Sequence, residues 1–298
     1  MDLDIIRALP KYHRRSFIAL LIAVSALLIL VDCFLLNDST SVLRVLSGYI
    51  EATVGALLVG LLVFWLFVSF TPYGESGGGL DQLEPNEITK EFEDMLREAQ
   101  RWRYKGNFGR YERGKVLPTL AGRANAHASI NIIDPTNEAL CRQHAEYRNS
   151  IPAIDKGRIY DADAVALEVV VTVIHCAWYV ATHKVAIDLY LSSVFDPVRI
   201  DSNDDAMILT VEDRRSPALK LIKQHFMYNH FDLQMRYARE QGRHLELGGL
   251  AAAQTIAALN VHEVEQYLGG IGMNDLCTRL TPQAILVACR EARNPYDN

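Results

Sequence analysis

Two long apolar runs near the start of the chain dominate its hydrophobic pattern. Residues 16–36 form a run of 21 residues whose only acidic or basic group is Asp32, and residues 52–70 form a second run of 19 residues without a charge. A helix that rises 1.5 Å per residue needs about 20 residues to cross the ~30 Å hydrocarbon core of a bilayer, so both runs meet the length criterion. The pattern predicts a transmembrane helical hairpin over 16–70. A cleaved signal peptide over the first run and a buried core hairpin are the alternatives.

Basic residues beside the two runs predict their orientation. The flank 1–15 carries four Lys and Arg residues, whereas the loop between the runs carries only Arg44. Because positive flanks stay on the cytoplasmic side, we expect both termini in the cytoplasm and a multi-pass protein of the inner membrane. Asp32 is a functional candidate because acids inside membranes are costly, although a position near the outer end of its helix would let it reach water.

The pattern changes after residue 70. Three consecutive glycines at 77–79, with prolines nearby, predict a flexible linker over 71–87. The remaining residues, 88–298, are numerous enough to bury a hydrophobic core, and we expect them to form a cytosolic α/β domain.

Alternating helical and strand periodicities support this fold class. Phe92, Met95, Leu96 and Ala99 recur at helical spacing in a helix that Asn86 or Thr89 would cap. Further helices are expected over 116–126, 136–148, 217–242, 261–268 and 282–292. The run 169–182 is too short for a third membrane span and favours a buried helix. Strands are expected over 129–133, 185–192, 198–201 and 206–211.

A Gly- and Arg-rich segment at 101–113 is the most concentrated basic and aromatic patch of the domain. Glycines let a backbone approach a ligand, and arginines offer planar forks for phosphate or carboxylate. Asp134 and Asn137 follow a predicted strand, where open α/β sheets bind ligands. The alternatives are a solvated turn whose arginines pair with local Glu, and Asp134 as a helix cap. The candidate ligand- or partner-binding residues here are Trp102, Gly106, Gly109, Arg110, Tyr111, Arg113, Asp134 and Asn137.

Charge and cysteine usage narrow the functional classes. The net charge of −6 falls entirely within residues 71–298, which hold 25 basic and 31 acidic groups. An acidic domain makes direct nucleic-acid binding an unfavoured main role. The five cysteines show no C-x-x-C pair and the nine histidines no H-x-x-x-H pattern, so we expect neither a metal site nor a cofactor.

Several motifs resemble a segment of bacterial phospholipase-D-like α/β domains, and the likeness covers most of 98–240. It includes Trp102-x-Tyr104-x-Gly106-x-x-Gly109-Arg110-Tyr111-x-Arg113-x-x-x-Leu117-Pro118-x-Leu120-Ala121, Ile132-Ile133-Asp134-Pro135-x-Asn137-x-x-Leu140-Cys141, Tyr147-Arg148, Pro197-Val198-Arg199-Ile200 and Leu209-Thr210. The resemblance adds Arg148 to the candidate residues. The H-x-K-x-x-x-x-D motif of that superfamily is missing, so the resemblance implies a degenerate ligand- or partner-sensing domain without a catalytic residue.

The arrangement of a membrane hairpin before a cytosolic domain is similar to that of bacterial anti-phage effectors, notably the two-transmembrane effectors associated with retrons. That resemblance implies membrane disruption when the cytosolic domain is triggered, a protein or ribonucleoprotein partner besides the lipid bilayer, and leaves homo-oligomerisation open. The alternative is a membrane-tethered phosphodiesterase or nucleotide-processing enzyme that places Arg110, Arg113 and Asp134 around a phosphate. A third alternative is a scaffold that localises partners.

Overall fold

The computed structural model describes residues 79–151 and 158–291, with short helical pieces at 26, 48–49, 52–56 and 60. The chain divides into two compact units, Met1–Ser76 and Gly77–Asn298. The described residues of the predicted hairpin, such as 52–56, are helical. Most of the hairpin, including Asp32, lies outside the described residues, so the two transmembrane helices stay a prediction.

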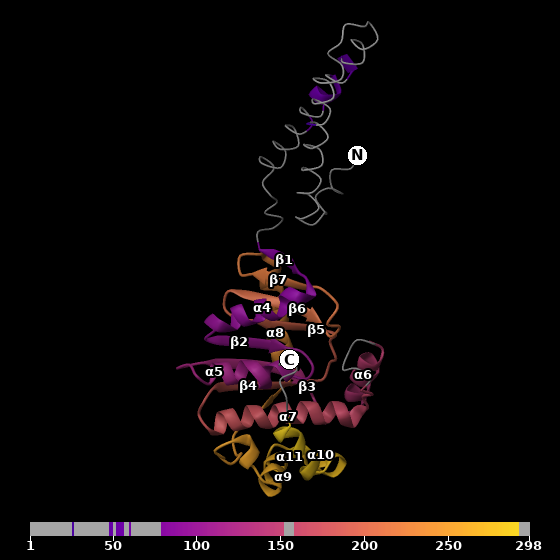
Figure 1. The fold of residues 1–298 in the computed structure, drawn as a ribbon. Coiled ribbons are helices and arrows are strands. Elements are labelled where there is room, and N and C mark those ends of the chain that lie inside the picture. Colours follow the sequence, from indigo (N-terminus) through magenta and orange to yellow (C-terminus); the bar gives the residue numbers. More distant parts are fainter. Residues whose placement is uncertain are drawn as a thin grey trace. The chain divides into compact units, whose positions relative to one another are not determined.

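The second unit is built on one mixed sheet of eight strands, in the order β1-β7-β6-β5-β2-β3-β4-β8 (Figure 1). The three strands β2, β3 and β4 run parallel, and every other neighbouring pair is antiparallel. The strands are β1 Leu80–Leu83, β2 Arg101–Lys105, β3 His127–Ile133, β4 Ala186–Ser192, β5 Val198–Ser202, β6 Ala206–Val211, β7 Ala218–Ile222 and β8 Arg243–Leu245.

Helices cover both faces of this sheet. The helices are α4 Pro85–Glu98, α5 Leu117–Leu120, α6 Glu138–Asn149, α7 Ala162–Ala181, α8 Phe226–Gln241, α9 Val261–Gly270, α10 Asn274–Leu280 and α11 Pro282–Arg290, with a π-helix η1 at Glu112–Val116 and a 3₁₀ turn η3 at Ile256–Ala258. Trp102 and Tyr104 of β2 belong to the main core with α7, whereas Arg103 bonds to Asp232 of α8. Because neighbouring residues of a strand point to opposite faces, α7 and α8 lie on opposite sides of the sheet.

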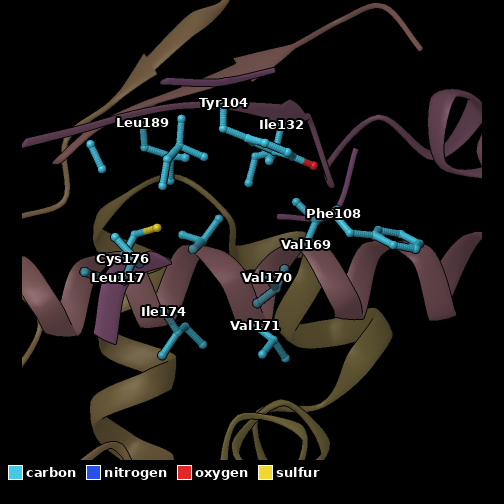
Figure 2. Packing of buried hydrophobic residues seen from close by; sticks show 14 of the residues in the cluster. Tyr104, Phe108, Leu117, Ile132, Val169, Val170, Val171, Ile174, Cys176 and Leu189 are labelled. Atoms are coloured by element: carbon cyan, nitrogen blue, oxygen red, sulfur yellow. The ribbon is translucent and has the colours of Figure 1, made fainter. Parts of the chain in front are cut away.

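Helix α7 is the centre of the hydrophobic core. Its 20 residues are apolar enough to cross a membrane by length and composition, the one such helix among the described residues, yet most of it is buried inside the domain. Figure 2 shows Val169 on the side of Tyr104 and Ile132 of the sheet, while Val171 and Ile174 point the other way. The C-terminal helices α10 and α11 contact α7. The prediction of a buried helix is therefore confirmed, and its apolar composition reflects packing on two sides.

Much of the expected fold is confirmed. The domain is α/β, and β3, β4, β5 and β6 coincide with the predicted strands to within a few residues. The helices α4, α6, α9 and α11 also lie where the periodicity placed them, and Asn137 caps α6 by accepting a bond from the Leu140 amide at 3.1 Å. Helix α4 begins earlier than expected, after Glu84, which forms a capping box with Glu87.

Several expected elements are wrong. Residues 101–105 form the central strand β2 rather than a turn, because the buried Trp102 and Tyr104 alternate with more exposed basic residues. Residues 218–222, expected at the start of a helix over 217–242, form β7, which hydrogen-bonds with β6 and β1. The helix expected over 116–126 ends at Leu120. Strand β1 lies within the predicted linker 71–87, and α10 lies between the two predicted C-terminal helices.

Candidate functional site

A pocket of about 310 Å³ opens beside the carboxyl ends of β2 and β6. These two strands are parallel to each other because both pair antiparallel with β5, which lies between them. The pocket walls come from the first half of α4, the turn 108–111 after β2, the end of β6 with the loop 212–216, and Arg148 of α6. Ligands of open α/β sheets bind at this kind of edge, so the pocket is the candidate site.

Arginine and aromatic side chains alternate around this pocket. The ring of Phe108 contacts the guanidinium groups of both Arg110 and Arg148, each 4.8 Å from the ring centroid. Arg199 of β5 lies over the ring of Phe92, at 4.9 Å. Such cation–π contacts hold the planar guanidinium groups in fixed orientations at the pocket wall.

Arg110 and Arg113 bond to one carboxylate of α7, that of Glu168, which Arg158 also contacts at 3.1 Å. Glu168 accepts bonds from Arg110 Nε at 3.0 Å, Arg110 Nη2 at 2.6 Å and Arg113 Nη2 at 2.6 Å. Arg113 also donates to the Thr172 hydroxyl at 2.7 Å. Burial by itself would raise the pKa of Glu168, but the two guanidinium groups outweigh it and lower the pKa to about 2. Arg113 is therefore a buried structural residue, and it does not line the pocket.

A second carboxylate, Glu212 at the end of β6, lines the pocket and bonds to Arg148. Glu212 Oε2 accepts from Arg148 Nη1 at 2.6 Å, and Oε1 lies 2.9 Å from His144 Nε2 and accepts from Asn107 Nδ2 at 3.0 Å. Burial would raise the pKa of Glu212, but the bonds from His144 and Arg148 lower it to about 2. Glu212 thus connects the turn after β2 with helix α6 through charged contacts.

A pair of acidic side chains, Glu112 and Asp201, lies in the core beside the pocket. Glu112 of η1 is fully buried, and its carboxyl group lies beside the carboxylate of Asp201 and the indole of Trp102. Burial, followed by the nearby carboxylate of Asp201, raises the pKa of Glu112 well above its usual range. Asp201 itself accepts a bond from Arg199 Nε. Arg199 compensates the negative charge of Asp201. A second negative charge on Glu112 would be repelled by Asp201 in the buried interior, so the protonated form of Glu112 is favoured.

The structure gathers part of the predicted set into the pocket. Gly109, Arg110, Tyr111 and Arg148 line it. Of the others, Trp102 is fully buried in β2. The alternative of a solvated turn whose arginines pair with a local Glu is wrong for Arg113, since its partner Glu168 lies 55 residues further along the chain.

The two glycines of the turn have structural reasons to be glycine. A Cβ atom on Gly106 would collide with the hydroxyl of Tyr104. Gly109 has a φ of +67°, and a Cβ atom there would lie 2.8 Å from Thr172 Cγ2. Its amide donates to the Tyr104 hydroxyl at 3.2 Å. Gly109 therefore fixes the left-handed turn that brings Arg110 to the pocket.

Asp134 and Asn137 lie outside the pocket lining. Asp134 Oδ1 accepts from the Thr136 amide at 2.9 Å and the Thr136 hydroxyl at 2.6 Å, and Oδ2 accepts from Arg243 Nη2 at 3.2 Å. The alternative of Asp134 as a helix cap is therefore wrong, because the N-cap of α6 is Asn137 and Asp134 bonds to Thr136 in the turn before that helix.

Sequence reasoning missed four charged residues of the pocket, Arg199, Glu212, Asp213 and Arg214. The charged run Glu212-Asp213-Arg214-Arg215 directly follows a correctly predicted strand, which is the same signal that selected Asp134. Among the described residues, no group of three or more His, Cys, Asp or Glu side chains could hold a metal ion.

Comparisons with known proteins add little to this geometry. No protein-family model matches the sequence, and no curated protein matches it. One similar solved structure is that of TrmBL2, an archaeal chromatin protein whose structure is described as showing a novel mode of DNA binding. The identity is 13% and the TM-score 0.33, over 67% of this chain and 65% of that chain, which is slightly less than two thirds of its length. A likeness of this degree carries no argument about function.

Proposed function

We propose that the protein is a membrane-anchored effector of bacterial anti-phage defence, whose folded unit senses a ligand or partner and controls the apolar segment 16–70. Membrane anchoring rests on the two apolar runs of 21 and 19 residues. Sensing rests on the pocket at the edge of the sheet. Binding of that ligand or partner would let the hairpins of several copies of the chain associate and permeabilise the membrane.

The position of the pocket in the chain carries this proposal. Strand β1 is the first element that the structure describes after the apolar runs, and two elements of the pocket wall adjoin it. Helix α4 begins two residues after β1, and the loop 212–216 leads into β7, which pairs with β1 from Leu80↔Leu221 to Leu83↔Ala218. A ligand that moves either wall therefore acts on the segment joined to the membrane hairpin.

The phosphodiesterase alternative finds less support. It requires Arg110, Arg113 and Asp134 to converge on one pocket with a base in reach. Arg110 lines the pocket, but Arg113 is bonded to Glu168 in the core and Asp134 is bonded to Thr136 and Arg243 elsewhere. The sensing function is therefore the better-supported proposal.

Membrane potential in cells that overproduce the full chain tests the proposal. We expect growth arrest and depolarisation, measured with a potential-sensitive dye, and loss of both with Leu62→Arg, because a cation at the centre of a spanning helix costs about 3 kcal/mol. Leu62→Ile is the matched control and should behave like the wild type. If the full chain never depolarises cells, with or without its genetic neighbours, the effector function is wrong.

A further inference from the structure

We propose that the pocket binds a phosphate-bearing small molecule whose anion replaces the carboxylate of Glu212 on Arg148. This inference rests on the proposed sensing function and specifies its ligand.

The arginine side chains that line the pocket suit an anionic ligand. Four of them line it, Arg110, Arg148, Arg199 and Arg214. Three already bond to a carboxylate, Arg110 to Glu168, Arg148 to Glu212 and Arg199 to Asp201. Of these three carboxylates, Glu212 is the one that itself lines the pocket. Guanidinium forks held on aromatic faces match the oxygens of a phosphate, which offers more acceptor sites than a carboxylate.

Glu212 already occupies the position of an anion in this pocket. Its Oε2 lies 2.6 Å from Arg148 Nη1, and the Arg148 side chain is only 7% exposed. A buried guanidinium needs an anionic partner, because an uncompensated charge in the interior is strongly destabilising. A ligand phosphate and Glu212 therefore compete for Arg148, and either one satisfies it.

Of the two carboxylates that bond to Arg110 and Arg148, Glu168 and Glu212, the second is the exchangeable one. Glu168 lies within the core helix α7 and bonds to Arg110, Arg113 and Arg158. Glu212 follows the last residue of β6 and begins the loop that carries the exposed residues Arg214 and Arg215. A small rotation of this loop moves Glu212 towards water, whereas moving Glu168 would require α7 to leave the core.

The volume of the pocket and its apolar wall indicate that the ligand carries an organic group besides the phosphate. A volume of about 310 Å³ lies at the lower end of the range for small-molecule pockets. The side chains of Ile88 and Phe92 on α4 supply apolar surface to the pocket wall. The ligand class is therefore an organic phosphate of about nucleotide size.

Exchange at Arg148 would also break the other contacts of Glu212. Its Oε1 accepts from Asn107 in the turn after β2 and lies against His144 of α6. Ligand binding therefore frees the loop 212–216, whose other end is β7 and, through β7, strand β1. This is the step that connects the ligand to the segment before β1.

The test is a calorimetric titration of the purified full chain in detergent with inorganic pyrophosphate. Glu212→Gln removes the competing charge and should bind at least about tenfold more tightly, whereas Arg148→Gln should bind at least about tenfold more weakly. Arg214→Gln, on an exposed residue that does not hold the core, should weaken binding severalfold. The control Arg142→Gln, exposed on the same helix as Arg148 and outside the pocket, should match the wild type.

Each arm gives a decision. Near-UV circular dichroism establishes that a variant is folded, and if Glu212→Gln is not, the pair Arg214→Gln and Arg142→Gln decides.

Malonate should bind more weakly than pyrophosphate, and equal binding would overturn the phosphate class. Micelles doped with phosphatidic acid distinguish a lipid source from a soluble one. If the pocket binds a lipid headgroup, the doped micelles should block pyrophosphate binding to the wild type. If it binds a soluble phosphate, they should leave the affinity for pyrophosphate unchanged. No pyrophosphate binding to any variant would overturn the inference, while depolarisation in cells would leave the effector function standing.

Discussion

Replacing Glu112 by glutamine is expected to stabilise the folded domain at neutral pH and to have little effect near pH 4. The Glu112 side chain is fully buried, and the carboxylate of Asp201 lies beside it. These conditions raise its pKa well above the ordinary 4.5, so the folded state retains a proton that the unfolded chain releases. Glutamine is neutral in both states and removes this difference.

The size of the effect follows from proton linkage. For an acid whose pKa is raised by folding, stability is lost as the pH rises from the unfolded pKa of 4.5 towards the folded pKa. Each pH unit in that interval costs about 1.4 kcal/mol, so at pH 7 the cost is at most about 3.5 kcal/mol. A domain of this size shifts its melting temperature by roughly 2–4 °C per kcal/mol, so Glu112→Gln should raise it by up to about 14 °C at pH 7.

Urea unfolding of the full chain in detergent, followed by tryptophan fluorescence between pH 4 and 7.5, measures this difference. Trp102 is fully buried and adjoins Glu112, so its emission reports the unfolding of this part of the core. Glu98→Gln replaces an exposed acid of α4 and should follow the wild type at every pH. A stability difference for Glu112→Gln that is the same at pH 4 and pH 7 would refute the reasoning, because it would mean that Glu112 is ionised in the folded protein.

Three further outcomes follow from the site, each measured by urea unfolding. Gly109→Ala should cost about 1–3 kcal/mol because of its positive φ and the Thr172 contact, whereas Gly248→Ala, with no atom within 4 Å of its Cβ position, should change little. Glu168→Gln should cost about 3–5 kcal/mol since it leaves buried Arg113 without its carboxylate, while exposed Glu138→Gln should stay within about 0.5 kcal/mol. The lowered pKa of Glu168, about 2, contributes stability above pH 4.5 that is lost as the pH falls towards 2.

The fold was largely predictable where packing and periodicity agree. The apolar run of α7 and the alternating strand β4 carry their burial pattern in the local sequence. Strand β7 could not be identified in the same way, because Leu219 and Ile222 also fit helical spacing. Its conformation is decided by hydrogen bonds to β6 and to β1, which lies more than 130 residues earlier in the chain.

The basic segment 101–113 shows why the candidate residues were only partly separated by sequence. Its first half is a buried strand and its second half a turn at the strand's carboxyl end, so Trp102 faces the core while Arg110 faces the pocket. Both kinds of residue fit a ligand-binding turn by composition. The period-2 alternation of Trp102 and Tyr104 was the available signal for the strand.

What the sequence could not reveal is which arginines have acidic partners in the core. Arg113 and Arg148 are both buried and both bonded to a carboxylate, but the partners lie 55 and 64 residues away and differ in where they are anchored. Glu168 belongs to the most buried helix, so its pairing with Arg113 is part of the core. Glu212 belongs to a pocket loop, so its pairing with Arg148 can be exchanged for a ligand's. The same chemical contact therefore stabilises the fold in one place and offers a trigger in the other, and Glu212→Gln should tighten pyrophosphate binding for that reason.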